Sequence, residues 1–166
     1  MNSFDAGLLL GLSVALLAAR HTGSLPRLAA GQAVVLAAGA VQRGLYPEAV
    51  TILLLSGAVL PWLLHRLSDA KPIRLRYGIV MRWCAGAVLV LLAVPFGIPL
   101  AVVMLGILAT AASRDRVVQV AGLLAMQNGI VLAGLDGPAP ERLAAMLPLI
   151  PALACAALWA SRRRPA

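Results

Sequence analysis

The sequence predicts an all-α, polytopic integral membrane bundle of about seven transmembrane helices, with the N-terminus outside and the C-terminus in the cytoplasm. Of the 166 residues, 61% are hydrophobic and 12% charged, and the mean hydropathy is +0.93. Soluble domains are about 45–50% apolar and about 25% charged. The charged residues lie at the edges of long apolar stretches, as expected when a charge at a transmembrane helix centre costs about 3 kcal/mol.

Seven apolar segments form the predicted spans of a single membrane domain covering residues 1–166. Several are shorter than the roughly 20 residues that cross a bilayer core upright. The stretch Pro95–Pro99 between the fourth and fifth segments permits either a turn or a kink within one long helix. The segments are Phe4–Ala19, Leu28–Gln42, Pro47–His65, Trp83–Val94, Ile98–Ala112, Val117–Leu135 and Leu143–Ala160.

The distribution of charge decides between these alternatives. With seven spans, most of the basic residues fall on one side, which the positive-inside rule places in the cytoplasm, whereas a single fused helix would move Arg114, Arg116 and the terminal arginines to the opposite side. The N-terminus, Met1–Asp5, is acidic and does not resemble a cleaved signal, so the first span is expected to stay in the membrane. The basic residues on the cytoplasmic side are Arg20, Arg27, Arg66, Lys71, Arg74, Arg76, Arg82, Arg114, Arg116, Arg162, Arg163 and Arg164.

Composition also excludes several functional classes. The net charge of +8 is explained by topology, so no nucleic-acid partner is expected. Cys84 and Cys155 lie inside apolar segments, where they are expected to be small buried hydrophobes, and His21 and His65 stand singly at segment ends. We therefore expect no metal, no cofactor and no catalytic residue, and the sequence identifies no small-molecule substrate.

The candidate intramembrane polar contacts are all neutral. A proton pump needs groups that load and release protons near the working pH, which amides do not. The favoured interpretation is that they hold helices together through hydrogen bonds of about 0.6 kcal/mol each, and the alternative is the remnant of a proton path. Prolines within the segments, Pro61 among them, remove a backbone donor and allow the helix to bend or widen. The polar candidates are Gln32, Ser56, Gln119, Gln127 and Asn128, with Thr110 beside them.

Small residues recur at spacings that bring helices close together. Gly7 and Gly11 are four residues apart in the first segment, and Gly122 and Gly129 lie in the sixth. Such residues let backbones approach where no hydrophobic driving force acts between helices. These four glycines are predicted helix-packing positions.

The loop from residue 66 to residue 82, here called the basic strip, allows two interpretations. The favoured one is a topology determinant attracted to anionic lipid, at about 1 kcal/mol per basic residue near the surface. The alternative is a docking strip for an acidic cytoplasmic arm. Its basic residues are Arg66, Lys71, Arg74, Arg76 and Arg82.

Two stretches carry a family resemblance. Residues 111–116 read Ala-Ala-Ser-Arg-Asp-Arg, and residues 120–129 read Val-Ala-Gly-Leu-Leu-Ala-Met-Gln-Asn-Gly. On them the chain resembles the membrane subunit family called hydrogenase-4 component E, which has an Arg-containing turn and a Met-Glu-Asn-Gly-like box. Gly31-Gln32-Ala33 is similar to that family's segment around Cys-Gln-Ser, and Leu60-Pro61 is similar to its Val-Pro in the third span.

The resemblance implies a multi-pass subunit of the bacterial inner membrane, within a hydrogenase, formate-hydrogenlyase-like or other complex-I-related oxidoreductase assembly that translocates protons. Residues 1–82 would hold three spans and the basic strip, and residues 83–166 the last four spans. Residues 98–160 would be similar to the K subunit of complex I. The partners would be other membrane subunits and lipid, and the chain itself would hold no redox cofactor.

The chain departs from the family pattern at its ionisable positions. Gln127 replaces the glutamate of the box, Ser56 aligns with a lysine, Leu149 lies near an acidic position, and Leu124 aligns with the K-subunit glutamate. We therefore predict a non-catalytic subunit that packs beside proton-translocating subunits without relaying protons itself, although a neighbouring subunit's titratable group could use Gln127 or Asn128 as a hydrogen-bond partner. The alternative is a stand-alone membrane scaffold or assembly protein. A transporter or membrane enzyme is disfavoured because the sequence offers too few polar residues to line a substrate cavity.

Overall fold

The structure is a computed structural model that describes residues 3–19, 21–67, 78–135 and 138. Within these ranges the chain is helical and has no β-strand, which confirms the all-α fold class. The elements are α1 (Ser3–Ala18), the 3-10 turn η1 (Thr22–Ser24), α2 (Leu25–Gln42), α3 (Tyr46–Ile52), the π-helical η2 (Leu53–Val59), α4 (Leu60–Leu67), α5 (Ile79–Ala93), the 3-10 turn η3 (Val94–Phe96), α6 (Ile98–Ala111) and α7 (Arg116–Gly134).

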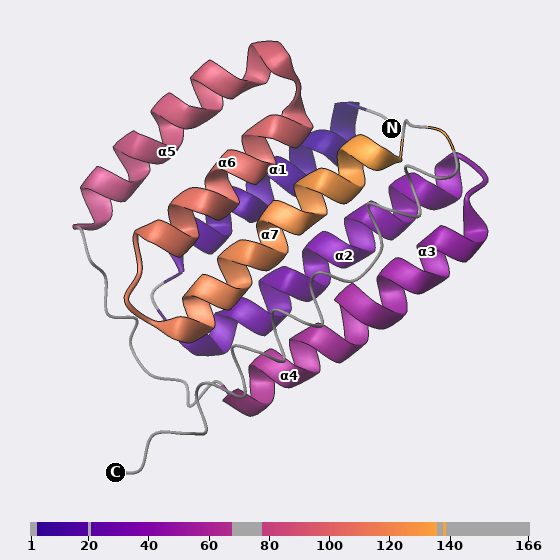
Figure 1. Ribbon diagram of the computed structural model, residues 1–166, viewed down its shortest axis with the longest axis horizontal. Helices are drawn as coiled ribbons and strands as arrows, with labels where there is room; N and C mark the ends of the chain where they lie inside the picture. The colour runs from indigo at the N-terminus through magenta and orange to yellow at the C-terminus, as the bar shows by residue number, and fades with distance from the viewer. Residues whose placement is uncertain (1–2, 20, 68–77, 136–137, 139–166) are drawn as a thin grey trace.

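The helices run alternately up and down in chain order, as Figure 1 shows. The elements α3, η2 and α4 follow one another without a break and act as one long helix in this alternation. Helix α5 lies at one edge of the bundle, the α3–η2–α4 unit lies at the opposite edge, and α1, α2, α6 and α7 lie between them. The alternation brings the end of α1, the starts of α2, α5 and α7, and the ends of α4 and α6 to one end of the bundle.

The fourth and fifth predicted segments are separate helices, as the charge distribution predicted. Helix α5 ends at Ala93, the 3-10 turn η3 contains Pro95, and Gly97 adopts φ +115° before α6 begins. An L-residue with a side chain rarely adopts that backbone angle, so glycine makes the reversal possible. Pro99 then lies in the first turn of α6, where its missing N–H costs no hydrogen bond.

The helix of the third predicted segment, Pro47–His65, is wider just before Pro61, as the sequence predicted. Pro61 has no N–H, and its ring would clash with the carbonyl four residues earlier, at Gly57. The chain forms the π-helical turn η2 at Leu53–Val59, immediately before this proline. Pro148 and Pro151 lie outside the described residues.

Helices α6 and α7 make the most extensive contact of any two helices in the described chain. A Cβ atom at Gly106 would lie 2.5 Å from the backbone N of Met126, and one at Gly122 would lie 2.8 Å from the Gly106 carbonyl oxygen. A Cβ atom at Gly129 would lie 2.9 Å from the Pro99 carbonyl oxygen. The two backbones therefore approach more closely than any side chain would permit.

The glycines of α1 behave differently from those of α7. Gly7 and Gly11 are exposed, and a Cβ atom at either would meet no described atom within 4 Å. They lie on the side of α1 that faces away from the core, whereas Leu9, Leu16 and Leu17 are the buried residues of this helix. Within the described residues, α1 packs through leucines rather than through these two glycines.

Two described stretches are long and apolar enough to cross a bilayer, Thr22–Gln42 and Arg116–Gly134. The remaining apolar helices are shorter; the 14 residues of α6 rise only about 21 Å against a hydrocarbon core of about 30 Å. The seventh predicted segment, Leu143–Ala160, lies outside the described residues. Of residues 98–160, the region predicted to be similar to the K subunit, the structure describes 98–135 and 138. The number of spans therefore stays a prediction.

The close approach of α6 and α7 predicts a strong effect of a single methyl group. Gly122→Ala should destabilise the protein by about 1–3 kcal/mol, because backbone atoms of α6 would have to move away from the new Cβ. Gly11→Ala is the matched control, since it adds the same methyl group to open space and gains the same helix propensity of about 1 kcal/mol.

The measurement is the midpoint of thermal unfolding of both variants and the original chain in a mild detergent. Gly122→Ala should unfold at a lower temperature than the original chain, and Gly11→Ala at the same or a higher temperature. Equal midpoints for the two variants would show that the α6–α7 contact is not as tight as described.

Candidate functional site

A chain of hydrogen bonds crosses the interior of the bundle and joins three helices. The Asn128 side-chain amide on α7 donates to Gln32 Oε1 on α2 at 3.0 Å, and Gln32 Nε2 donates to Ser13 Oγ on α1 at 3.0 Å. Ser13 Oγ in turn donates to the carbonyl oxygen of Leu9 at 2.9 Å. The three side chains are buried, with exposed fractions of 1% for Ser13, 0% for Gln32 and 3% for Asn128. We call these three residues the interhelical polar chain.

The interhelical polar chain lies between apolar layers on every helix that contributes to it. On α1, Ser13 lies between the buried residues Leu9 and Leu16. On α7, Asn128 lies between Leu124 and Val131, which are also buried. Water is thus kept from the polar groups, so each of them has to be satisfied by another group of the protein.

The other predicted polar residues occupy different places. Gln119 is half-buried near the start of α7, where its Nε2 donates to the carbonyl oxygen of Ser113 at 3.1 Å. Ser56 is half-buried in η2 at the edge of the bundle. Gln127 is buried beside Asn128 and engages in an interaction of its own. Of the five predicted contacts, the structure joins Gln32 and Asn128 directly by a hydrogen bond.

The turn between α6 and α7 is held by local hydrogen bonds. Asp115 caps α7 because its Oδ1 accepts from the backbone N–H of Val117 at 2.9 Å, and its own N–H donates to Ser113 Oγ at 3.0 Å. Thr110 Oγ1 donates to the Gly106 carbonyl oxygen at 2.9 Å and lies 3.4 Å from that of Gln119. These contacts fix the start of α7 and hence the depth at which Asn128 meets Gln32.

The chemistry available to the interhelical polar chain is limited to hydrogen bonding. A hydroxyl and two carboxamides neither gain nor lose a proton near neutral pH, so they cannot carry a proton by titration. Within the described ranges no group of three or more His, Cys, Asp or Glu side chains comes together as a metal site would require. The arrangement can therefore fix three helices relative to one another.

Of the basic strip, the structure describes the side chain of Arg82 alone; the side chains of Arg66, Lys71, Arg74 and Arg76 lie outside what is described. Arg82 is in the first turn of α5 and is only 2% exposed, unlike a residue of a solvated surface strip. None of its three guanidinium nitrogens has a hydrogen-bond partner in the described structure.

The expectation that Cys84 is buried was wrong, because this residue is exposed on α5. Sequence reasoning also missed two features. Ser13 is the last side chain of the interhelical polar chain, where it accepts from Gln32, and the available signal was that it is the only hydroxyl or amide between Phe4 and Ala19. The burial of Arg82 had no such signal, because its position at a segment edge is that of an ordinary interfacial arginine. A side chain's burial there depends on how α5 lies against its neighbours.

Comparison with protein-family models, with curated proteins and with solved structures finds no match to this chain. The resemblance to hydrogenase-4 component E therefore stays a prediction from the short motifs at residues 31–33, 60–61, 111–116 and 120–129.

The interhelical polar chain predicts a specific energetic coupling. Gln32→Leu leaves the Asn128 amide without its acceptor, and Asn128→Leu leaves Gln32 Oε1 without its donor, so each change should destabilise the protein by about 1–3 kcal/mol. The double variant should lose less than the sum of the two, because removing both partners leaves no orphaned group between them.

The measurement is a double-mutant cycle on the free energy of unfolding in mixed detergent micelles. The coupling between the two substitutions should be at least about 0.5 kcal/mol. Additive effects would show that the two amides do not bond in the folded protein.

Proposed function

We propose that this chain is a multi-pass subunit of the bacterial inner membrane that packs beside other membrane subunits of a complex-I-like assembly, of hydrogenase, formate-hydrogenlyase or related respiratory type. It acts as a non-catalytic structural subunit and does not relay protons itself. The observation that carries the proposal is the combination of a buried, neutral interhelical polar chain with an apolar exterior.

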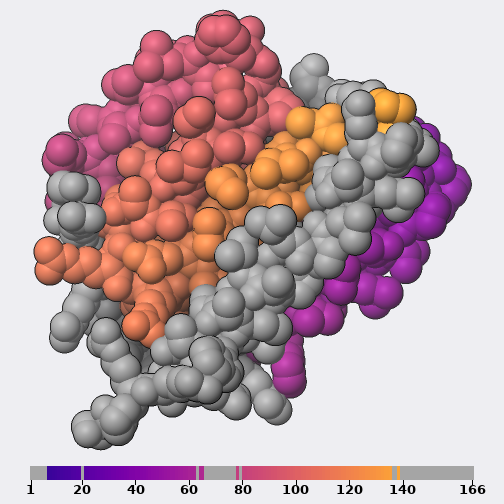
Figure 2. Space-filling model, viewed as in Figure 1, coloured from indigo at the N-terminus to yellow at the C-terminus, as the bar shows by residue number. Residues whose placement is uncertain are grey.

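The apolar exterior occupies both edges of the bundle. Exposed large hydrophobic side chains lie on α5 at one edge and along the α3–η2–α4 unit at the other, the two edges seen at opposite sides of Figure 2. Soluble proteins rarely expose such continuous patches, which favour lipid or protein contacts. The residues on α5 are Val80, Met81, Trp83, Val88, Leu91 and Leu92, and those on the other edge are Val50, Leu53, Leu54, Leu55, Val59 and Trp62.

The ends of the bundle carry charge with the asymmetry that a membrane orientation would need. Arg27, Arg114 and Arg116 are exposed at the end where α2 and α7 begin. The opposite end carries Arg43 and Glu48, a cation together with an anion. The positive-inside rule would place the first end in the cytoplasm, with α1 starting outside.

The buried side chains of the bundle support a subunit that relays no protons. Buried carboxylates and lysines mark proton routes in membrane proteins, and the position of the family's glutamate holds Gln127 here. The buried side chains that cross between α1, α2 and α7 are a hydroxyl and two amides. These side chains support packing, and a complex-I-related assembly would carry its protons through other subunits.

The second candidate is a stand-alone membrane scaffold or assembly protein. The same bundle and the same apolar edges would serve it, since a second copy of the chain could cover an edge. The two candidates differ in what accompanies the chain when it leaves the membrane.

The experiment is extraction of the C-terminally tagged chain in a gentle detergent, followed by affinity purification and mass spectrometry. The proposal expects antiporter-like membrane subunits together with a hydrogenase or quinone-type peripheral arm. Recovery of the chain alone, folded and stable, would contradict the proposal and favour the scaffold.

A pair of bulky substitutions makes that experiment more informative. Ala58→Trp and Val88→Trp each place an indole at an exposed position, the first on η2 and the second on α5. A subunit that docks through one edge should lose its partners in one variant and keep them in the other. Retention of every partner in both variants would show that neither edge is a docking surface.

A further inference from the structure

The buried charge of Arg82 has no counter-ion among the described residues. Its guanidinium is always ionised, its side chain is 2% exposed, and Nε, Nη1 and Nη2 all lack a hydrogen-bond partner. A buried guanidinium is unfavourable unless an anion pairs with it. The described side chains provide no such anion, so the functional form of the protein needs one from elsewhere.

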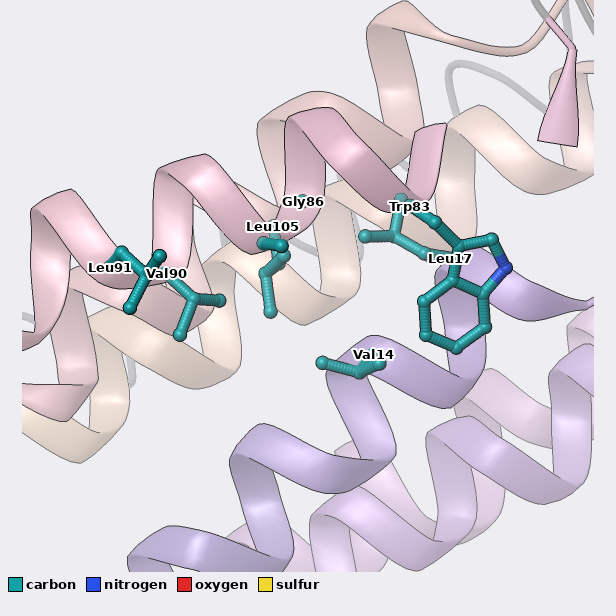
Figure 3. A pocket seen from close by; sticks show the side chains of 8 residues that line it. Val14, Leu17, Trp83, Gly86, Val90, Leu91 and Leu105 are labelled. Atoms are coloured by element: carbon teal, nitrogen blue, oxygen red, sulfur yellow. The ribbon is translucent and has the colours of Figure 1, made fainter. Parts of the chain in front are cut away.

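An apolar groove begins at the next residue along α5, Trp83. It has a volume of about 350 Å³ and lies between α5, α1 and α6. Figure 3 shows its lining: Trp83 and Leu91 near its two ends on α5, Val14 and Leu17 on α1, and Leu105 on α6. From Trp83 to Leu91 the helix rises about 12 Å. Because the lining residues are apolar, the groove suits a hydrocarbon chain rather than a polar solute.

Arg82 and the groove share one side of α5. Gly86, which lines the groove, follows Arg82 by four residues and so lies on the same helix face. Arg82 lies in the first turn of α5, one turn nearer the start of the helix than Gly86. In Figure 3 the indole nitrogen of Trp83 lies on the side of its ring that is turned away from Val90 and Leu91. Polar groups thus gather at one end of an otherwise apolar groove.

We propose that this groove and Arg82 bind one anionic phospholipid, with an acyl chain in the groove and the phosphate paired with the guanidinium. The proposal rests on the membrane placement made under the proposed function. The start of α5 adds to the site, because no side chain caps this helix terminus and the N-terminus of a helix favours a phosphate.

A phospholipid accounts for both halves of the site with one molecule. A free phosphate would satisfy Arg82 and leave the groove empty, and an apolar chain without a phosphate would fill the groove and leave the charge unpaired. A carboxylate from a neighbouring subunit would pair with Arg82 but does not explain the adjoining groove. The cytoplasmic end of the bundle, where Arg82 lies, is also where anionic headgroups attract basic residues.

The test uses the full chain purified in detergent, with whichever subunits accompany it. Dioleoylphosphatidylglycerol is titrated in, bound lipid is counted by native mass spectrometry, and the thermal unfolding midpoint is recorded. The matched probes are dioleoylglycerol, which has the same acyl chains without the phosphate, and glycerol phosphate, which has the phosphate without the chains. The original chain should bind one phosphatidylglycerol and unfold at a higher temperature with it, and neither matched probe should reproduce the shift.

Variants separate the two halves of the site. Arg82→Gln should bind phosphatidylglycerol roughly tenfold more weakly, as expected for the loss of a charged hydrogen bond, and without lipid it should unfold no earlier than the original chain because it buries no unpaired charge. Ala87→Trp should weaken binding by filling the groove. Arg114→Gln, which removes an exposed charge at the same end of the bundle, should leave binding unchanged.

Several results would overturn the proposal. Equal lipid binding by Arg82→Gln, or an equal shift with dioleoylglycerol or with glycerol phosphate, would each do so. So would loss of a co-purifying subunit from Arg82→Gln while phosphatidylglycerol has no effect, which would assign the counter-ion to a protein carboxylate. Membrane fractionation of the same sample tests the membrane placement separately. If the partner subunits are lost, lipid binding by the chain itself can still be measured.

Discussion

The hydrogen bond between Gln32 and Asn128 is the interaction on which the arrangement of the bundle depends. It joins residues 96 positions apart, and through Ser13 it brings in α1 as well. An amide buried among leucines and valines without a partner costs about 1–3 kcal/mol, more than the roughly 0.6 kcal/mol that an average interhelical bond contributes in a membrane protein. Arrangements of α1, α2 and α7 that leave these amides unpaired are therefore disfavoured by more free energy than the hydrogen bond itself contributes.

The rest of the fold uses contacts that need no polar group. Helices α6 and α7 meet backbone to backbone at Gly106, Gly122 and Gly129, where a methyl group would already clash. Such proximity maximises dispersion contacts, which matter most where apolar surface gains nothing by leaving lipid. The cap at Asp115 sets where α7 begins, so the glycine contacts and the amide bond act at consistent depths. The edges formed by α5 and by α3–η2–α4 carry exposed apolar side chains.

The sequence was informative about elements and less so about their partners. The expected segments 28–42 and 117–135 correspond closely to α2 and α7, the reversal at Gly97 followed from the charge pattern, and the π turn followed from Pro61. Local rules are sufficient there, because a proline or a run of apolar residues acts within its own helix. The pairing of Gln32 with Asn128 and the inclusion of Ser13 could not be predicted, since they depend on which helix faces meet. For the same reason Gly11 matched a packing pattern yet lies on an exposed face, and Arg82 matched a surface pattern yet is buried.

The most direct test of the central claim, that this bundle crosses the inner membrane with alternating helices, is cysteine labelling in intact bacterial cells. Tyr46→Cys, Phe96→Cys and Arg114→Cys are introduced singly, at exposed positions, into a chain whose Cys84 and Cys155 are replaced by alanine. A membrane-impermeant maleimide should label Tyr46→Cys and Phe96→Cys in intact cells, and Arg114→Cys only after the inner membrane is permeabilised. Labelling of all three positions in intact cells, or of none of them before permeabilisation, would contradict the account.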